Sequence, residues 1–297
     1  MMDNTSQMTR RELLAVSAGA ASAMALGEEA TALAEDEVPK LRLIDANVSL
    51  FRWPFRRFPL DETRLLAEKL QSLGVSEAWA GSFEGVFHRD VAGVNSRLFD
   101  ECRKHPMFVP IGSVNLTLPG WETDLQRCLG QHNMVGVRVH PNYHGYTLEH
   151  EAFAKLLNIA AEAGRFVQIA VSMEDTRTQN ELVPVADVDI SPLVPLLKQH
   201  QKARVHLLNY RPQATFLEQI RELPGVYFDT ARVDGTDSIP RLVEAAAPGR
   251  VLFGSHAPFL VPEAALIRTH ESGLLDTHTL QDVLADNANR FREAESA

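Results

Sequence analysis

Short apolar runs alternate with segments of helical spacing along most of the chain. The apolar runs predict eight strands, at residues 41–50, 76–83, 108–115, 135–141, 166–173, 203–209, 226–233 and 251–253. The segments after them predict helices, at residues 61–74, 92–104, 121–131, 149–164, 191–201, 212–223, 238–247, 262–270 and 277–285. Strands that alternate with helices imply βαβ units and a parallel sheet. Eight such units in about 220 residues favour an α/β fold of the (β/α)8 type, a TIM barrel, over an open sheet.

This alternation continues from residue 41 to residue 291 without a break that would mark a second domain. We therefore expect one barrel domain over 41–291 and a short tail over 292–297. No glycine-rich nucleotide motif of the GxGxxG or GxxxxGK[ST] type occurs, which disfavours a nucleotide-binding fold.

The first 40 residues have a different character. Arg10 and Arg11 precede an Ala-rich apolar run over 13–26, and Ala32-Leu33-Ala34 then offers a small-x-small cleavage site. This order is typical of a twin-arginine export signal, here over 1–34 with a linker over 35–40, and it predicts a periplasmic or extracellular protein. The alternative is an amphipathic helix. The apolar run is too short for a membrane span, so none is expected in the mature protein.

Composition narrows the classes of partner. The formal net charge is −10, which argues against a nucleic-acid partner and favours a small-molecule substrate. A local arginine cluster could still bind an anion. Cys102 and Cys128 lie on different predicted helices and are expected to be buried free thiols. The sequence leaves a homodimer open.

Polar residues collect at the predicted carboxyl ends of the strands, where the chemistry of such barrels is located. We take three of them as candidate catalytic residues: His256, His140 and Asp229. Six others are candidate substrate-binding residues: Asn47, Ser49, Arg138, Asn115, Asn209 and Glu84. A structural role is an equal alternative for Asp229, as an acceptor within the fold, and for Glu84, as a loop cap.

Five segments carry a resemblance to a known family: IDANVS, GVRVHP, HLLN, LFGSHAPF and DNANRF. In these segments the chain resembles the amidohydrolase superfamily, in its amidohydrolase-related branch of metal-dependent hydrolases and decarboxylases, over almost all of 41–291. The resemblance implies a TIM barrel with metal ligands at the strand ends. This chain departs from that pattern. The two histidines of the family's first strand are replaced by Asn47 and Ser49, those of the fifth and sixth strands by Ser172 and Asn209, and the aspartate of the eighth by His256.

Two interpretations of the chemistry follow, so the cofactor stays open. A rearranged site for zinc or another divalent metal could use His140, His144, His256 and Asp229, although Pro141 and Gly145 predict a loop between the first two. In a metal-free site, His256 would act as general acid or base, oriented by Asp229, while Arg138 holds an anionic group. The asparagines would then donate hydrogen bonds to the substrate.

The expected function is that of an exported amidohydrolase-like hydrolase or lyase, acting on a small polar substrate at the carboxyl face of the barrel. The alternative is a barrel that has lost its chemistry and binds a ligand or a partner. The loop after the first strand, FRWPFRRF, bears on both. We expect Trp53, Phe55 and Phe58 to pack over the barrel mouth, while the arginines of the loop could clamp an anion.

Overall fold

The computed structural model of the chain describes residues 41–271 and 273–294, so the predicted export signal and linker lie outside the described residues. Its strands are β1 (Ile44–Leu50), β2 (Glu77–Ser82), β3 (Phe108–Pro110), β4 (Gly112–Ser113), β5 (Gly136–Val139), β6 (Phe166–Ala170), β7 (Val205–Leu208), β8 (Val226–Asp229) and β9 (Val251–Leu252). Its helices are α1 (Thr63–Ser72), α2 (Glu84–Phe87), α3 (Val91–Lys104), α4 (Trp121–Gln126), α5 (Pro141–His144), α6 (Glu151–Glu162), α7 (Leu193–Gln199), α8 (Ala214–Ile220), α9 (Ser238–Ala245), α10 (Pro262–His270), α11 (Thr277–Gln281) and α12 (Asn287–Glu293). The π-helical turns η1 (Arg127–Gln131) and η2 (Asp282–Asp286) continue α4 and α11.

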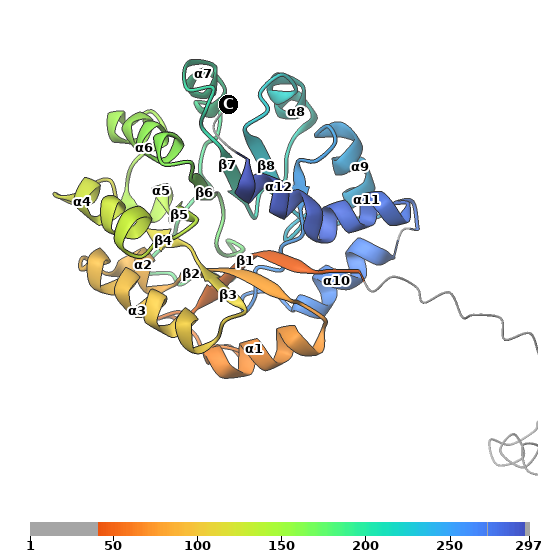
Figure 1. Cartoon of the computed structure of the whole chain (residues 1–297), viewed down its shortest axis with the longest axis horizontal. Coiled ribbons are helices and arrows are strands. Elements are labelled where there is room, and N and C mark those ends of the chain that lie inside the picture. The colour runs from red at the N-terminus through yellow and green to blue at the C-terminus, as the bar shows by residue number, and fades with distance from the viewer. Residues whose placement is uncertain (1–40, 272, 295–297) are drawn as a thin grey trace, which may run out of the picture. The chain divides into compact units, whose positions relative to one another are not determined.

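All strand pairs are parallel, in the orders β1-β2-β3 and β4-β5-β6-β7-β8-β9. The predicted third strand is split into β3 and β4 at Ile111, whose N–H still bonds to β2. The chain after β9 pairs with β1, since the N–H of His256 donates to the carbonyl of Asn47 (2.9 Å). Eight strand positions thus form the predicted (β/α)8 barrel, with the strands inside a ring of helices (Figure 1).

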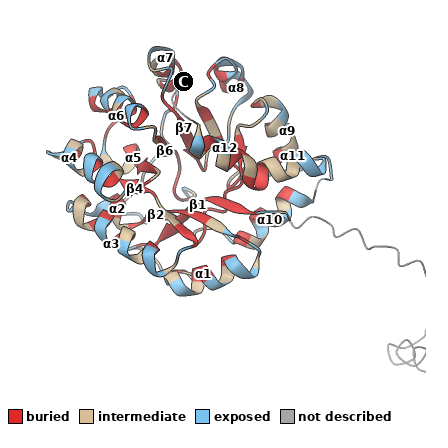
Figure 2. Cartoon of the chain, in the orientation of Figure 1, coloured by how far each residue is buried: buried red, intermediate tan, exposed pale blue. Residues whose placement is uncertain are grey.

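Alternating side chains explain this layering. In β6, Val167 and Ile169 belong to the large apolar cluster that the helices cover, whereas Phe166 belongs to another cluster together with Trp79. Figure 2 shows buried residues along the strands and exposed ones on the outer faces of the helices. Phe291 of α12 packs on Phe166, with ring centroids 4.6 Å apart, and so completes an apolar layer in the barrel interior.

The aromatic loop after β1 packs as predicted. Trp53 is buried, and its ring centroid lies 5.1–5.9 Å from those of Phe55, Phe83, Tyr143 and Phe259. The same cluster includes residues at and after the end of β6, so it covers that part of the mouth. Aromatic pairs of this kind prefer edge-to-face geometry, which most of these contacts have.

Two local features differ from expectation. Residues 141–144 form the short helix α5 and not a loop, because Pro141 suits the first helical position and Gly145 ends the helix in the left-handed region. Helix α12 continues two residues beyond the predicted barrel end at 291. Cys102 and Cys128 are buried free thiols, as predicted. In the described part of the chain, no helix has both the length and the apolar character needed to cross a membrane.

Candidate active site

The buried carboxylate of Asp229 joins three strands at the carboxyl end of the barrel. The side-chain amide of Asn47 donates to Asp229 (2.6 Å) and to the side-chain oxygen of Asn209 (2.8 Å). The backbone N–H groups of Asn209 and Ala231 also donate to Asp229. Burial outweighs these hydrogen bonds and raises the pKa of Asp229 to about 7. We call Asn47, Asn209 and Asp229 the Asp229 cluster; all three side chains are buried.

A second buried group forms around Arg138 of β5. Its Nε donates to Gln168 on β6 (2.9 Å) and its Nη1 to the hydroxyl of Ser49 (3.0 Å). Gly81 leaves room for the guanidinium, because a Cβ there would lie 2.6 Å from Nη1. Burial lowers the pKa of Arg138 to about 10, and the charge of Asp229 opposes that shift, so Arg138 stays cationic at neutral pH. Its Nη2 has no partner among the described residues.

Buried histidines at the mouth are held neutral. The Nε2 of His256 lies 2.8 Å from the carbonyl of Met173, and that of His144 lies 3.2 Å from the carbonyl of Gly85. Because a carbonyl can only accept, each Nε2 carries the proton and each Nδ1 presents a lone pair without a partner in the described residues. Burial lowers the pKa of His256 to about 3 and that of His144 to about 4. His140, 5.8 Å from His144 between ring centroids, has a lowered pKa for the same reason.

The predicted orientation of His256 by Asp229 is wrong. Met173 accepts the Nε2 proton of His256, while the carboxylate of Asp229 is engaged by the rest of its cluster. The ring of His256 stacks on that of Phe259, with centroids 5.0 Å apart. His256 and Asn209 both have left-handed backbones, with φ of 57° and 58°, which is uncommon for residues with side chains and recurs at functional sites.

Two predicted substrate-binding residues engage partners of other kinds. Glu84 begins α2 and pairs with Arg97 of α3, with an N–O distance of 2.8 Å. Asn115 accepts hydrogen bonds from both the backbone and the hydroxyl of Thr117, which closes a local turn. The structure therefore brings Asn47, Ser49, Arg138, Asn209 and Asp229 into the two buried groups. Glu84 instead joins α2 to α3, and Asn115 closes a local turn.

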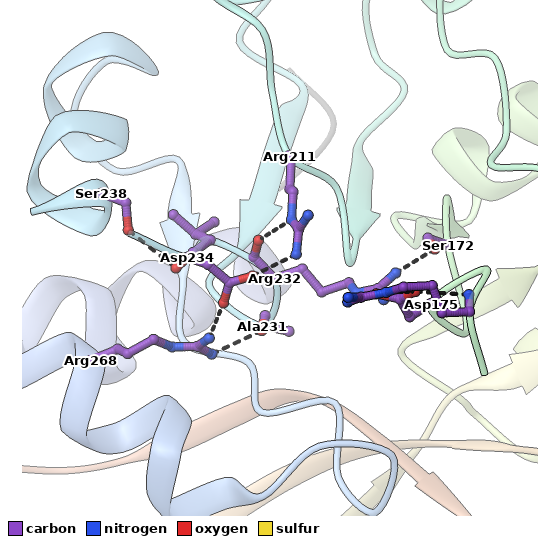
Figure 3. A network of polar contacts seen from close by, with 10 residues as sticks. Ser172, Asp175, Arg211, Ala231, Arg232, Asp234, Ser238 and Arg268 are labelled. Carbon is purple, nitrogen blue, oxygen red and sulfur yellow. Dashed lines mark hydrogen bonds and ion pairs between the residues drawn. The ribbon is translucent and has the colours of Figure 1, made fainter. Parts of the chain in front are cut away.

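A pocket of about 460 Å³ opens beside His256, and we call it the mouth pocket. Its walls include Arg56, Glu174, Asp175, Arg177, Arg232 and Phe259. Arg56 pairs with Glu174 (3.1 Å) and Arg177 clamps Asp175 with two hydrogen bonds. Arg232 reaches across to the hydroxyl of Ser172 (2.5 Å), as Figure 3 shows. Three arginines against two carboxylates, with a neutral His256, leave this pocket positively charged.

The side chains at the expected ligand positions do not fit a metal ion. Asn47 turns its amide N–H groups, which are donors and cannot bind a metal ion, toward Asp229 and Asn209. Ser49 lies against the cationic Arg138. Throughout residues 41–271 and 273–294, no group of three or more His, Cys, Asp or Glu side chains is placed to hold a metal. The rearranged metal site predicted from the sequence does not meet this condition either. Its members would have been His140, His144, His256 and Asp229.

Comparison with known proteins agrees with this architecture. A protein-family model described as Amidohydrolase matches residues 54–291. The chain belongs to the amidohydrolase family. No curated protein matches the sequence. Three solved structures of amidohydrolase-type proteins or decarboxylases share its fold at 12–13% identity.

The first of these structures is a Staphylococcus aureus protein named as an amidohydrolase, with a TM-score of 0.68, 12% identity, and coverage of 85% of this chain and 100% of that one. The 5-carboxyvanillate decarboxylase of Sphingomonas paucimobilis has a TM-score of 0.67 and 13% identity, over 84% and 98% of the two chains. The dihydroxybenzoic acid decarboxylase of Polaromonas, solved with manganese and an inhibitor, has a TM-score of 0.66 and 12% identity, over 86% and 98%. At these identities the likeness shows the fold alone.

Sequence reasoning missed several residues of this amidohydrolase-family site. Gln168 faces Arg138 directly across β5 and β6, which equal spacing along the two strands could have indicated. Asp45, fully buried, shares the alternation of Asn47 and Ser49 along β1. Arg232 was missed because the sequence predicts it inside a strand over 226–233, whereas β8 ends at Asp229 and Arg232 lies in the loop that follows.

Proposed function

We propose that the chain is a hydrolase or lyase of the amidohydrolase family that acts on a small carboxylate in the mouth pocket, with its own side chains in place of the usual metal ligands. The observation that carries this proposal is the position of His256 among arginines in the lining of that pocket. His256, whose buried Nδ1 has no hydrogen-bond partner among the described residues, lines the same pocket as Arg56 and Arg232.

The pocket suits an aromatic or other flat carboxylate. Guanidinium groups bind carboxylates through paired N–H donors. Phe259, stacked on His256, supplies a flat apolar surface, and the guanidinium of Arg56 lies 5.4 Å from its ring centroid. The solved decarboxylases of the same fold act on such acids, among them 2,6-dihydroxybenzoate and 5-carboxyvanillate.

His256 supplies the chemistry in this proposal. The Nδ1 of His256 accepts a hydrogen bond from the substrate or from a water molecule, since burial keeps the ring neutral and its pKa near 3. Asp229, whose pKa is about 7, does not line the mouth pocket and supports the barrel wall behind it. Gly254 allows the two regions to approach, because a Cβ there would lie 2.9 Å from that of Asp229.

The test is a turnover screen of aryl and alkyl carboxylates, with product detected by chromatography and by released carbon dioxide. For a substrate found this way, we expect His256→Gln to lower kcat/KM by about 100-fold while the fold is retained, because glutamine keeps the N–H donor to Met173 and loses the aromatic lone pair. Arg89→Gln, in the exposed turn before α3, is the matched control and should leave kcat/KM unchanged. Normal turnover by His256→Gln contradicts the role given to His256.

A ligand-binding barrel is the second candidate. The Asp229 cluster favours it, because the cluster is fully buried and its carboxylate is already hydrogen-bonded to three N–H groups. Saturable binding of a carboxylate without any product after long incubation would select this candidate.

We also infer export by the twin-arginine route from Arg10, Arg11 and the segment that follows. Residues 1–40 fused to a folded reporter should deliver it to the periplasm, and replacement of both arginines by lysine should keep it in the cytoplasm. Delivery that is unaffected by the replacement contradicts this route. The homodimer stays a prediction, which light scattering of the mature chain would check.

A further inference from the structure

A groove of about 630 Å³ lies between α8 and α9, on walls that take no part in the mouth pocket apart from Arg232. We call it the α8–α9 groove. We propose that it is a second binding site, for a small amphipathic anion with a compact apolar body and one carboxylate or phosphate group. This site is separate from the proposed chemistry at His256.

The groove has an apolar floor. Leu217 of α8, Leu242 of α9 and Val233 line it, and all three are nearly buried by their neighbours. Its volume is in the usual range for pockets that take small organic molecules. A ligand body placed there would cover apolar surface that the two helices leave open to solvent.

The rim of the groove is cationic, although the whole chain carries a net charge of −10. Four arginines and two carboxylates line it, which is a local excess of +2. Figure 3 shows that Arg232 points away, toward Ser172, which leaves a balance of +1 inside the groove. Such a balance matches a ligand with one negative charge.

Two of the remaining three arginines are available to bind the anionic group of a ligand. Arg211 is already held by Asp234, at 2.5 Å (Figure 3). Arg221 and Arg241 are exposed and form no ion pair within the described residues. One comes from the end of α8 and the other from α9, so their side chains border the floor from two elements. A guanidinium pair of this kind suits a carboxylate or phosphate better than a single charge does.

The wall between the two helices is fixed in place. Asp234 accepts hydrogen bonds from Arg211 and from Arg268 of α10, and the hydroxyl of Ser238 donates to the carbonyl of Val233 (3.2 Å). These contacts hold the loop between β8 and α9, as Figure 3 shows. A rigid wall lowers the entropic cost of binding, since little has to be ordered when the ligand arrives.

The test is calorimetric titration of the full chain with octanoate, octyl phosphate and octanol at constant ionic strength. We expect saturable binding of at least one anion, and octanol should bind at least 10-fold more weakly. The comparison of octanoate with octyl phosphate identifies which head group is preferred. The double variant Arg221→Gln/Arg241→Gln should raise Kd about 10-fold or more, while Arg89→Gln should leave it unchanged.

A further variant separates this site from the mouth pocket. His256→Gln should leave the Kd of the preferred anion unchanged, because His256 does not line the groove. Binding that is lost in His256→Gln and kept in the arginine double variant would assign the anion to the mouth pocket and overturn the proposal. Equal affinity for octanol, or no saturable binding of either anion, would overturn it as well.

Discussion

The Asp229 cluster and the mouth pocket both lie at the carboxyl end of the barrel, yet they differ in what their polar groups have left to bind. In the Asp229 cluster the carboxylate and the amide N–H groups of Asn47 are already hydrogen-bonded within the barrel wall, and among the described residues only the side-chain oxygen of Asn47 lacks a partner. In the mouth pocket, the Nδ1 of His256 has no partner in the described part of the chain, and the guanidinium of Arg232 donates there to the hydroxyl of Ser172. We interpret the first region as structural and the second as the place where a ligand binds.

The largest expected effect comes from removing the carboxylate of the cluster. Asp229→Leu leaves the amide of Asn47 and the N–H groups of Asn209 and Ala231 without their acceptor in a dry interior. We expect the free energy of unfolding, measured by urea denaturation, to fall by about 3–5 kcal/mol.

Asp229→Asn is the matched control, because it keeps the volume and one acceptor oxygen. It should cost about 1–2 kcal/mol, which is less than the leucine variant. If Asp229→Leu were as stable as the wild type, the cluster would not have the structural role that separates it from the mouth pocket.

The pH dependence of stability sharpens the same contrast. Burial lowers the folded-state pKa of four neutral histidines, which are His140, His144, His206 and His256. The unfolded chain therefore binds more protons than the folded chain below pH 6.5, and stability is lost as the pH falls. Burial raises the pKa of Asp45 to about 6 and that of Asp229 to about 7, so these groups add stability as the pH falls. The four histidines together change stability more than the two carboxyl groups do, so the folded protein becomes less stable as the pH falls.

We therefore expect unfolding at pH 5.5 to take up about two protons, and stability to fall by roughly 2 kcal/mol between pH 6.5 and pH 5.5. Denaturation curves across this range provide the measurement. Asp229→Asn should make the loss steeper, since it removes a carboxyl group that opposes it. A stability that rises toward pH 5.5 would mean that the carboxyl groups dominate.

The barrel could be predicted from the sequence because its signal is repeated. Each strand and helix is short, but eight alternations agree, and the last strand, predicted over 251–253, is present as β9 (Val251–Leu252). The candidate site was predicted only in part. The predicted carboxyl ends of the strands indicated Asn47, Asn209 and Asp229, whereas the partner of His256 is the carbonyl of Met173, which has no signal in the sequence.

Gly254 tests how closely the segment before His256 packs against the Asp229 cluster. Its substitution should lower the free energy of unfolding less than Asp229→Leu does. A Cβ at Gly254 would lie 2.9 Å from that of Asp229, which is closer than real contacts of this kind, and 3.1 Å from that of Asn47, which is tighter than most of them. We expect Gly254→Ala to lower the free energy of unfolding by about 1–3 kcal/mol through overpacking. Gly130→Ala, where a Cβ meets nothing within 4 Å, is the control and should be neutral or slightly stabilising.

The smallest effect on stability is expected at the edge of the mouth pocket. Arg56 pairs with Glu174 and is about one-third exposed, so Arg56→Gln should change the free energy of unfolding by about 1 kcal/mol or less. In the proposed function the guanidinium holds the anionic group of the substrate equally in the ground state and the transition state, so its loss should affect binding more than turnover. We expect KM to rise about 5-fold with kcat unchanged. Arg64→Gln, which breaks the exposed pair with Glu68 on α1, should change neither constant. A fall in kcat alone would place Arg56 in the chemistry, and the mouth pocket would then differ from the Asp229 cluster in a second way.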